Sequence, residues 1–371
     1  MNFLRYVPKP IAELPWIILG LVLGLTGFGL LVLYSAAGGS VRPWALNQGL
    51  HFIFFFAGAL LLSLVSVDRW KQVALPGFLI IVVMLFGVEL LGAVSKGSRR
   101  WLDLGFIRLQ PSEILKLFIV LAVARFYDLL PAGEIRGGSA IWPALLMAGI
   151  PALMIMAQPD LGTALMVVAG AVSVMFMAGV PLRLFLGGGA ALTLLAPVAF
   201  HFMHDYQRKR VLIFLNPESD PLGAGYHITQ SKIAIGSGGI FGKGFMNGSQ
   251  SHLDYLPEGH TDFVFATMAE EWGLIGGMAI IFAYLYIIRW GFKIAGQSRG
   301  RFARLTAAGL STTLFFYMSI NIMMVLGMAP VVGIPLPLIS FGGTAMMTVM
   351  AILGILMALE RDCKGSGGLH R

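Results

Sequence analysis

Long apolar runs separated by short polar breaks dominate the chain. A bilayer core of roughly 30 Å needs about 20 apolar residues per helix, and runs of that length recur from end to end. The pattern predicts ten transmembrane helices, over residues 14–34, 48–66, 74–94, 112–130, 140–158, 161–179, 183–203, 263–288, 304–328 and 338–359. We therefore expect an all-α polytopic membrane protein in which a long loop, about 204–262, joins helices 7 and 8.

Composition supports this assignment. Of the 371 residues, 57% are hydrophobic and only 12% are charged, far from the balance of soluble domains. The formal net charge of +8 fits the positive-inside rule and anionic headgroups, so no nucleic-acid partner is expected. The single cysteine, Cys363, excludes an internal disulfide. We expect one transmembrane domain over residues 1–371. Its first helix is long enough to be retained, and no A-x-A-like cleavage site follows it.

Lysine and arginine placement predicts the orientation. With both termini in the cytoplasm, the inside segments carry most of the positive residues. The outer positives then fall almost wholly in two loops, one around residues 95–110 and the other at 204–262. This bias predicts cytoplasmic termini and makes both loops extracytoplasmic.

The first of these loops leads into the fourth span through the sequence QPSEILKL, residues 110–117. Ser112 is expected to cap that helix, and Glu113 then favours the positive end of the helix dipole. Lys116 follows three residues later, so it can pair with Glu113. Two interpretations stay open: a structural ion pair that anchors the helix, or a fixed cation in a polar cavity facing the outer side.

The long loop contains proline, glycine and aspartate breaks around a central amphipathic piece, so short interfacial helices are expected. Loops of this length are uncommon unless they are functional. The glycine run at residues 236–244 fits neither established phosphate-binding pattern, and no strand pattern precedes it. Its glycines either let backbone N–H groups approach a phosphate or simply turn the chain.

Ionisable residues at the mouth of the eighth span indicate function, because such groups are costly at membrane depth. They occur in LPEGHTDFVFATMAEEWG, residues 256–273. If the helix starts near Asp262, that residue shares a face with Ala266, and Glu270 lies on the order of 12 Å deeper. Asp262 is either a helix N-cap or a general base beside a bound polyanion. Glu270 and Glu271 are expected to brace neighbouring helices or to line a deeper polar channel.

Five long motifs, in order and covering nearly the whole chain, carry a family resemblance. They are RWLDLGFIRLQPSEILKL, QPDLGTALM, DPLGAGYHITQSKIAIGSGG, LPEGHTDFVFATMAEEWG and GIPLPLISFGG. The chain resembles the SEDS family of shape, elongation, division and sporulation proteins. The motifs GYHITQSKIAIGSGG and ISFGGTA resemble the elongation members more than the division members.

The resemblance implies a ten-helix fold and a peptidoglycan glycosyltransferase that polymerises lipid II at the outer face of the bacterial inner membrane. It also implies work with the elongation machinery and a class B penicillin-binding protein as transpeptidase partner. The family's essential aspartate falls on Asp262, its Glu/Lys pair on Glu113 and Lys116, and its QPD corner supplies Asp160. His260 and Glu258, in the same segment as Asp262, are further candidates for substrate binding.

This chemistry needs a base for the attacking sugar hydroxyl, and Asp262 at the membrane rim suits that role. The departing pyrophosphate needs positive charge, for which the candidates are Lys116, Arg99, Arg100 and Arg210, acting directly or with a divalent cation, Mg²⁺ or Mn²⁺. No motif for a bound cofactor is present. One inverting displacement requires no second carboxylate. The rival interpretations are a lipid II flippase and a structural scaffold for the transpeptidase.

Overall fold

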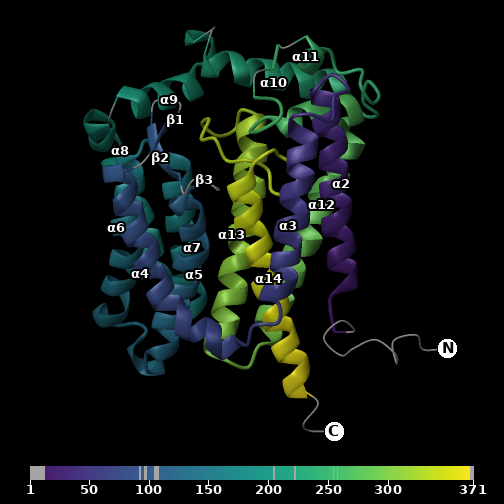
Figure 1. Ribbon diagram of the computed structural model, residues 1–371. Coiled ribbons are helices and arrows are strands. Elements are labelled where there is room, and N and C mark those ends of the chain that lie inside the picture. Colours follow the sequence, from purple (N-terminus) through teal and green to yellow (C-terminus); the bar gives the residue numbers. More distant parts are fainter. Residues whose placement is uncertain are drawn as a thin grey trace, which may run out of the picture.

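The computed structural model describes residues 13–91, 93–95, 98–103, 108–203, 205–220, 223–253, 255–256 and 258–367. In these ranges, ten helices have 18 or more residues and form a bundle (Figure 1). They are α2 (Trp16–Ala36), α3 (Trp44–Leu62), α4 (Val67–Leu91), α5 (Pro111–Leu129), α6 (Gly138–Ala157), α7 (Leu161–Ala178), α8 (Leu182–Phe202), α12 (Val264–Gln297), α13 (Arg301–Val325) and α14 (Gly343–Gly367). Eight of them are long and apolar enough to cross a membrane outright. The predicted ten-helix, all-α architecture is confirmed.

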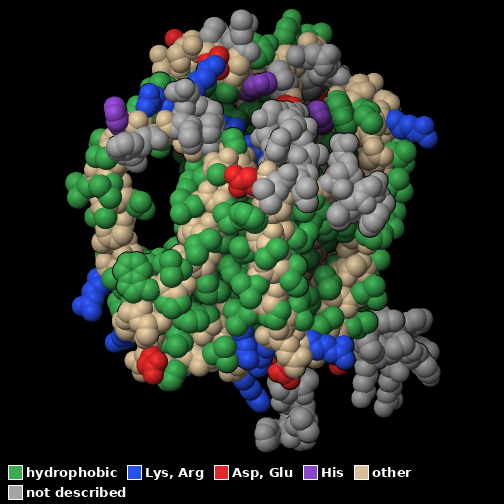
Figure 2. All heavy atoms as spheres, turned by 60° about the vertical axis from the view of Figure 1, so that its left-hand side comes forward, with side chains coloured by type: hydrophobic (Ala, Val, Ile, Leu, Met, Phe, Trp, Pro, Cys, Tyr) green, Lys and Arg blue, Asp and Glu red, His purple; other side chains and the backbone are tan. Residues whose placement is uncertain are grey.

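The centre of the bundle is built on α5, which is buried on all sides and packs against α4, α7 and α13. Small residues let these helices approach closely. A Cβ atom on Gly309 of α13 would lie 2.6 Å from both Val120 of α5 and Val174 of α7. Helix α8 is the opposite case, since residues 186–198 are exposed throughout. Open space passes through one side of the molecule in the space-filling view (Figure 2).

Short elements cover one end of the bundle, opposite the end at which α2 begins and α14 finishes (Figure 1). Within the long loop these are α9 (Asp205–Leu215), η3 (Pro217–Ser219), α10 (Ala224–Gly238) and α11 (Ser249–His252). The expectation of short helices in this loop is confirmed. The loop before α5 contains three strands that were not predicted: β1 (Ala93–Ser95), β2 (Ser98–Asp103) and β3 (Arg108–Leu109), antiparallel in that order.

The start of α5 differs from the prediction. Helix α5 begins at Pro111 and its N-cap residue is Gln110, which makes no side-chain capping bond. Ser112 is therefore already inside the first turn and is not the cap. Proline at the first helical position explains the shift, because its fixed φ suits that position and it has no N–H to leave unsatisfied.

Helix α12 is broken at Gly273, which has φ 63° and ψ −161°. The break frees backbone groups on both sides, and the glycine run 236–244 satisfies them. The N–H groups of Lys243 and Gly244 donate to the carbonyls of Glu270 and Glu271, each at 3.0 Å. In return, the N–H groups of Leu274 and Ile275 donate to the carbonyls of Gly239 and Ile240, at 3.0 and 3.2 Å.

Glycine is required where the glycine run meets α12, because the two backbones nearly touch. A Cβ atom on Gly238 would lie 2.1 Å from the carbonyl oxygen of Ala269. One on Gly242, whose φ is 80°, would lie 2.1 Å from that of Glu271. The glycine run therefore supplies the backbone partners that the broken helix lacks, a role that neither interpretation of the run included.

Candidate active site

Asp262 lies in the turn immediately before α12, at the end of the bundle covered by the short helices. The helix begins at Val264 and its N-cap is Phe263, without a side-chain capping bond. The capping interpretation of Asp262 is therefore not supported. The prediction that Asp262 continues the helix and shares a face with Ala266 is wrong, since helical phase does not extend into the turn. The Asp262 side chain is partly exposed.

A buried amide fixes the backbone at this aspartate. The Asn321 side chain, on α13, donates from Nδ2 to the carbonyl of Asp262 at 2.9 Å and to that of Ile334 at 2.7 Å. Asn321 is fully buried. One side chain thus ties the turn that carries Asp262 to the segment between α13 and α14.

That segment, residues 326–342, is called the platform segment here, because several outer elements meet on it. A Cβ atom on Gly333 would lie 3.4 Å from Asp262 Oδ2. Arg210 of α9 donates from Nη1 to the carbonyl of Val331 at 2.8 Å. A Cβ atom on Gly162, in the first turn of α7, would lie 2.7 Å from the carbonyl oxygen of Val332. The platform segment therefore brings Arg210, Asp262 and the start of α7 to one place.

Asp160 forms the corner between α6 and α7. Its Oδ1 accepts from the Thr163 N–H at 3.1 Å, so it is the N-cap of α7. Its Oδ2 accepts from Gln110 Nε2 at 3.2 Å and lies 3.9 Å from Arg100 Nη1. The Arg100 guanidinium also donates to the carbonyl of Gln158 at 2.9 Å and to the carbonyl of the next residue. Asp160 is thus a nearly buried structural cap that holds a partly exposed cation beside the corner.

Glu113 and Lys116 form a buried ion pair, with 2.7 Å between Lys116 Nζ and Glu113 Oε1. Tyr317 of α13 donates its hydroxyl to Glu113 Oε2 at 2.8 Å, and its ring lies 4.4 Å from Lys116 Nζ. The lysine side chain is 1% exposed. This geometry favours the structural interpretation of the pair, since Lys116 Nζ is buried between the Glu113 carboxylate and the Tyr317 ring.

The remaining candidates in the turn shape its backbone. The His260 ring stacks on Trp44 of α3, with 3.9 Å between centroids and 7° between planes. The Phe341 N–H donates to the carbonyl of His260 at 3.0 Å, which adds a further link to the platform segment. Glu258 accepts from the Thr261 hydroxyl at 2.8 Å. These contacts hold both residues in the turn that carries Asp262.

His227 of α10, which was not predicted, stacks on Phe263 directly after Asp262, at 5.8 Å between centroids. Burial lowers the pKa of the His227 imidazole, and the negative charges of Glu258 and Asp220 partly oppose this effect. The neutral form is therefore favoured beside the turn that carries Asp262.

Glu270 and Glu271 brace the break in α12, as one of the two interpretations predicted. Glu270 pairs with Lys243 at 2.6 Å and accepts from the backbone N–H of Gln250 at 3.1 Å. Glu271 accepts from the hydroxyl of Ser35 on α2. Both carboxylates are therefore engaged at the break in α12. Among the described residues, no group of three or more His, Cys, Asp or Glu side chains could hold a metal ion.

One sequence candidate, Arg99, is not placed. The side chain of Arg99 lies outside the described part of the structure, although its backbone belongs to β2. Conversely, sequence reasoning missed Tyr317, Asn321 and the supporting role of the platform segment. The signal was present, because a tyrosine and an asparagine within a long apolar span need buried polar partners.

Comparisons with known proteins agree with this arrangement. A family model described as "Cell cycle protein", covering FtsW, RodA and SpoVE, matches residues 15–365. The peptidoglycan glycosyltransferase MrdB of Escherichia coli K12 is 48% identical over 293 residues, 77% of each chain. A chain in a solved peptidoglycan synthase complex is 32% identical, with a TM-score of 0.82 over 94% of this chain and 98% of that chain. The crystal structure of the rod shape determining protein RodA of Thermus thermophilus is 28% identical, with a TM-score of 0.68 over 94% and 97%.

Proposed function

We propose that this chain, which belongs to the FtsW, RodA and SpoVE family, is a peptidoglycan glycosyltransferase that polymerises lipid II for cell elongation, with Asp262 as its general base. It is a multi-pass protein of the bacterial inner membrane. The observation that carries the assignment of the base is the meeting of Asp262 and Arg210 on the platform segment. A carboxylate beside a cation at the rim of the bundle suits the transfer of a sugar from a pyrophosphate carrier.

In the proposed step, the 4-hydroxyl of the acceptor sugar attacks the anomeric carbon of the donor. The new glycosidic bond forms as the bond to the lipid pyrophosphate breaks, and the hydroxyl proton passes to the Asp262 carboxylate. The stereochemistry inverts, because a single displacement occurs. A retaining mechanism needs a second carboxylate about 5 Å away. Glu270 is engaged with Lys243 and Gln250, which supports the single-base mechanism.

Arg100 and Arg210 are the cations best placed to meet the departing pyrophosphate. Both are partly exposed. Arg100 donates to the carbonyl of Gln158 and lies 3.9 Å from the Asp160 carboxylate, and Arg210 donates to the carbonyl of Val331. A guanidinium has five N–H donors in a fixed fork, which suits phosphate oxygens. Arg99 stays a candidate from the sequence. Lys116 acts indirectly in this proposal, since its pair with Glu113 and Tyr317 fixes α5 against α13.

A divalent cation would be held mainly by the substrate. Mg²⁺ is commonly bound through one or two carboxylates together with substrate phosphates and water. Asp262, Asp160 and Glu258 are the candidate carboxylates that could contribute an oxygen. Bound there, Mg²⁺ or Mn²⁺ would neutralise charge on the leaving pyrophosphate.

The proposed orientation has both termini in the cytoplasm and the Asp262 site facing the periplasm. Lysine and arginine residues support it, because they are frequent in the segments at the end of the bundle where α2 begins. We further propose a class B penicillin-binding protein as the transpeptidase partner. The likeness to a chain from a complex that coordinates polymerization and crosslinking supports this partner.

The test is polymerisation of lipid II by the purified full-length chain with its class B partner, in the presence of moenomycin to silence the other polymerase class. We expect glycan strands from the wild type and a loss of at least about 10²-fold in Asp262→Asn, with normal expression and partner binding. Glu218→Gln is the matched control, because Glu218 is an exposed carboxylate in the same outer layer. It should retain full activity.

Other outcomes would reject parts of the proposal. If Asp262→Asn produced glycan strands at the wild-type rate, the assignment of Asp262 as the general base would be rejected, and a scaffold role would remain for this aspartate. No strands from either protein, together with lipid II crossing the bilayer of reconstituted vesicles, would assign a flippase. Loss of folded protein in Asp262→Asn would make the carboxylate structural.

A further inference from the structure

The seam between α2 and α12 holds two cavities, one after the other along the same two helices. The first, of about 670 Å³, lies where α2 begins and is lined by Trp16, Ile17, Tyr286, Arg289, Lys293 and Glu360, among others. We call it the basic pocket. The second, of about 490 Å³, lies further along the seam, toward the end that carries Asp262. We call it the apolar groove.

Two cations line the basic pocket, on neighbouring turns of α12. Arg289 and Lys293 are one helical turn apart and exposed, and neither forms an ion pair or hydrogen bond in the described part of the chain. The one carboxylate there, Glu360, is already engaged: it pairs with Lys364 at 3.0 Å and accepts from Trp290 Nε1 at 3.2 Å. The basic pocket therefore offers uncompensated positive charge.

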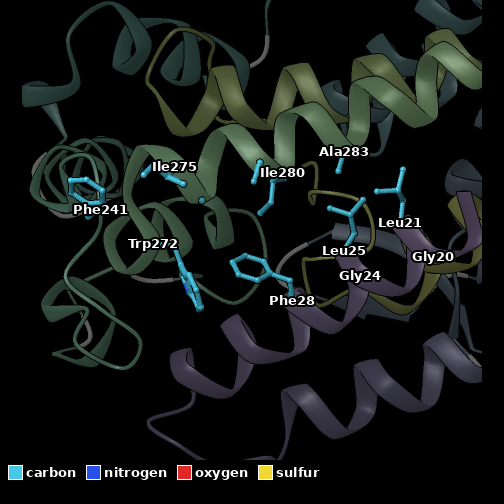
Figure 3. A pocket seen from close by; sticks show the side chains of 12 residues that line it. Gly20, Leu21, Gly24, Leu25, Phe28, Phe241, Trp272, Ile275, Ile280 and Ala283 are labelled. Atoms are coloured by element: carbon cyan, nitrogen blue, oxygen red, sulfur yellow. The ribbon is translucent and has the colours of Figure 1, made fainter. Parts of the chain in front are cut away.

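Glycine gives the apolar groove its depth. Gly20 and Gly24 of α2 line it, and a Cβ atom on either would meet no atom within 4 Å. These glycines leave space instead of making a close helix contact. Figure 3 shows Leu21, Leu25 and Phe28 along one wall, and Trp272 and Ile280 on the α12 side.

We propose that this seam binds one anionic phospholipid, with its phosphodiester on Arg289 and Lys293 and an acyl chain along the apolar groove. The inference goes beyond the proposed function and does not depend on it. Basic pockets between transmembrane helices, at headgroup level, suit anionic headgroups. Trp16 and Tyr286 are of the aromatic types enriched at the membrane interface.

The dimensions and charges fit a lipid better than a protein helix. Along α12, Arg289 and Gly276 are separated by roughly 20 Å at 1.5 Å per residue, enough to cover one leaflet's hydrocarbon layer of about 15 Å. A transmembrane helix in the seam would cover two cations that have no acceptor there, at a high desolvation cost. A phosphodiester supplies that acceptor.

The test is native mass spectrometry of the full-length protein in detergent, titrated with phosphatidylglycerol, cardiolipin or phosphatidylethanolamine. We expect one tightly bound anionic lipid and weaker binding of phosphatidylethanolamine. Arg289→Gln with Lys293→Gln should weaken phosphatidylglycerol binding by roughly 30-fold, from the loss of two surface cations. The control pair Arg136→Gln with Arg183→Gln removes the same charge from exposed positions outside the pocket and should leave binding unchanged.

A second pair of variants tests the groove. Gly24→Leu fills it without altering charge and should reduce binding at least tenfold, whereas Gly27→Leu, on the same helix but outside the groove, should not. Equal binding of all three lipids, or no effect of the Arg289 and Lys293 changes, would overturn the site. Displacement by millimolar glycerol 3-phosphate would show a soluble-anion site instead. Loss of the lipid on assembly with a class B partner would assign the seam to the partner's helix and also overturn the proposal.

Discussion

Asn321→Leu is the most direct probe of how the site is held. Leucine keeps the side-chain volume nearly unchanged but removes the amide that donates to Asp262 and Ile334. A buried acceptor that loses its partner costs about 1–3 kcal/mol. Because the site is fully buried but lies near the outer end, where water can partly compensate, we expect the free energy of unfolding to fall by about 2–4 kcal/mol.

The same substitution should slow catalysis. The amide fixes the backbone of Asp262, and a displacement of about 1 Å can reduce a rate by about 10²-fold. We therefore expect glycan polymerisation to fall by roughly 10- to 100-fold at saturating lipid II, with a smaller change in the apparent affinity for lipid II. Unfolding titrations with SDS in mixed micelles give the first quantity, and single-turnover polymerisation gives the second.

The control is Thr306→Val on the same helix. Thr306 is fully buried and its hydroxyl has no hydrogen-bond partner, so its removal should change the free energy of unfolding by less than about 1 kcal/mol. If the Asn321→Leu protein were as stable as the wild type, the two hydrogen bonds would not contribute to the free energy of unfolding as argued. A destabilised protein that polymerises at the full rate would refute the positioning of Asp262 through its backbone.

Three further outcomes follow from the structure. Lys116→Met should cost about 3–5 kcal/mol of stability in SDS unfolding, because it leaves the Glu113 carboxylate buried without its cation, and adding Glu113→Gln should restore part of that loss. Burial lowers the pKa of the His227 imidazole, so as the pH decreases below about 6.5 the unfolded chain takes up a proton before the folded chain does, and the free energy of unfolding decreases. His227→Gln should make the unfolding temperature depend less on pH in thermal scans between pH 7 and 5. Gly242→Ala should lower the thermal unfolding temperature, because its Cβ would collide with a backbone carbonyl of α12, whereas Gly236→Ala, with open space around it, should be neutral or stabilising.

Hydrophobic run length was sufficient to locate every membrane-length helix. The bilayer imposes a minimum apolar length, and this constraint acts on sequence directly. For example, the span predicted at 161–179 is found as Leu161–Ala178. The largest error at a single boundary is at the end of the eighth span, predicted at residue 288 and found at Gln297. There the helix continues past the apolar run into a segment containing Arg289 and Lys293, and hydropathy gives no signal for such an extension.

Side-chain partners were less predictable than spans. The pair of Glu113 with Lys116 follows from helical spacing, and the structure confirms it. The predicted phase of Asp262 failed because the helix starts two residues later, at Val264, and the helical rotation of 100° per residue does not apply to a residue in the preceding turn. The backbone hydrogen bonds between the glycine run and α12 could not be predicted from either segment alone, because each segment supplies the partners that the other lacks.

The platform segment explains how this fold can place an irregular backbone beside Asp262. Non-helical chain within a membrane bundle is tolerated only if its carbonyl and N–H groups find partners in protein or water. Gln48 of α3 donates to the carbonyl of Ser340 and accepts from the N–H of Gly342, and Tyr284 of α12 donates to the carbonyl of Pro337. With Asn321 on α13, buried polar side chains from three helices satisfy this segment and hold it in place. A rigid loop can fix the geometry around Asp262, which a mobile loop could not do, so isolated polar residues within apolar spans point to where such a protein holds its reacting groups.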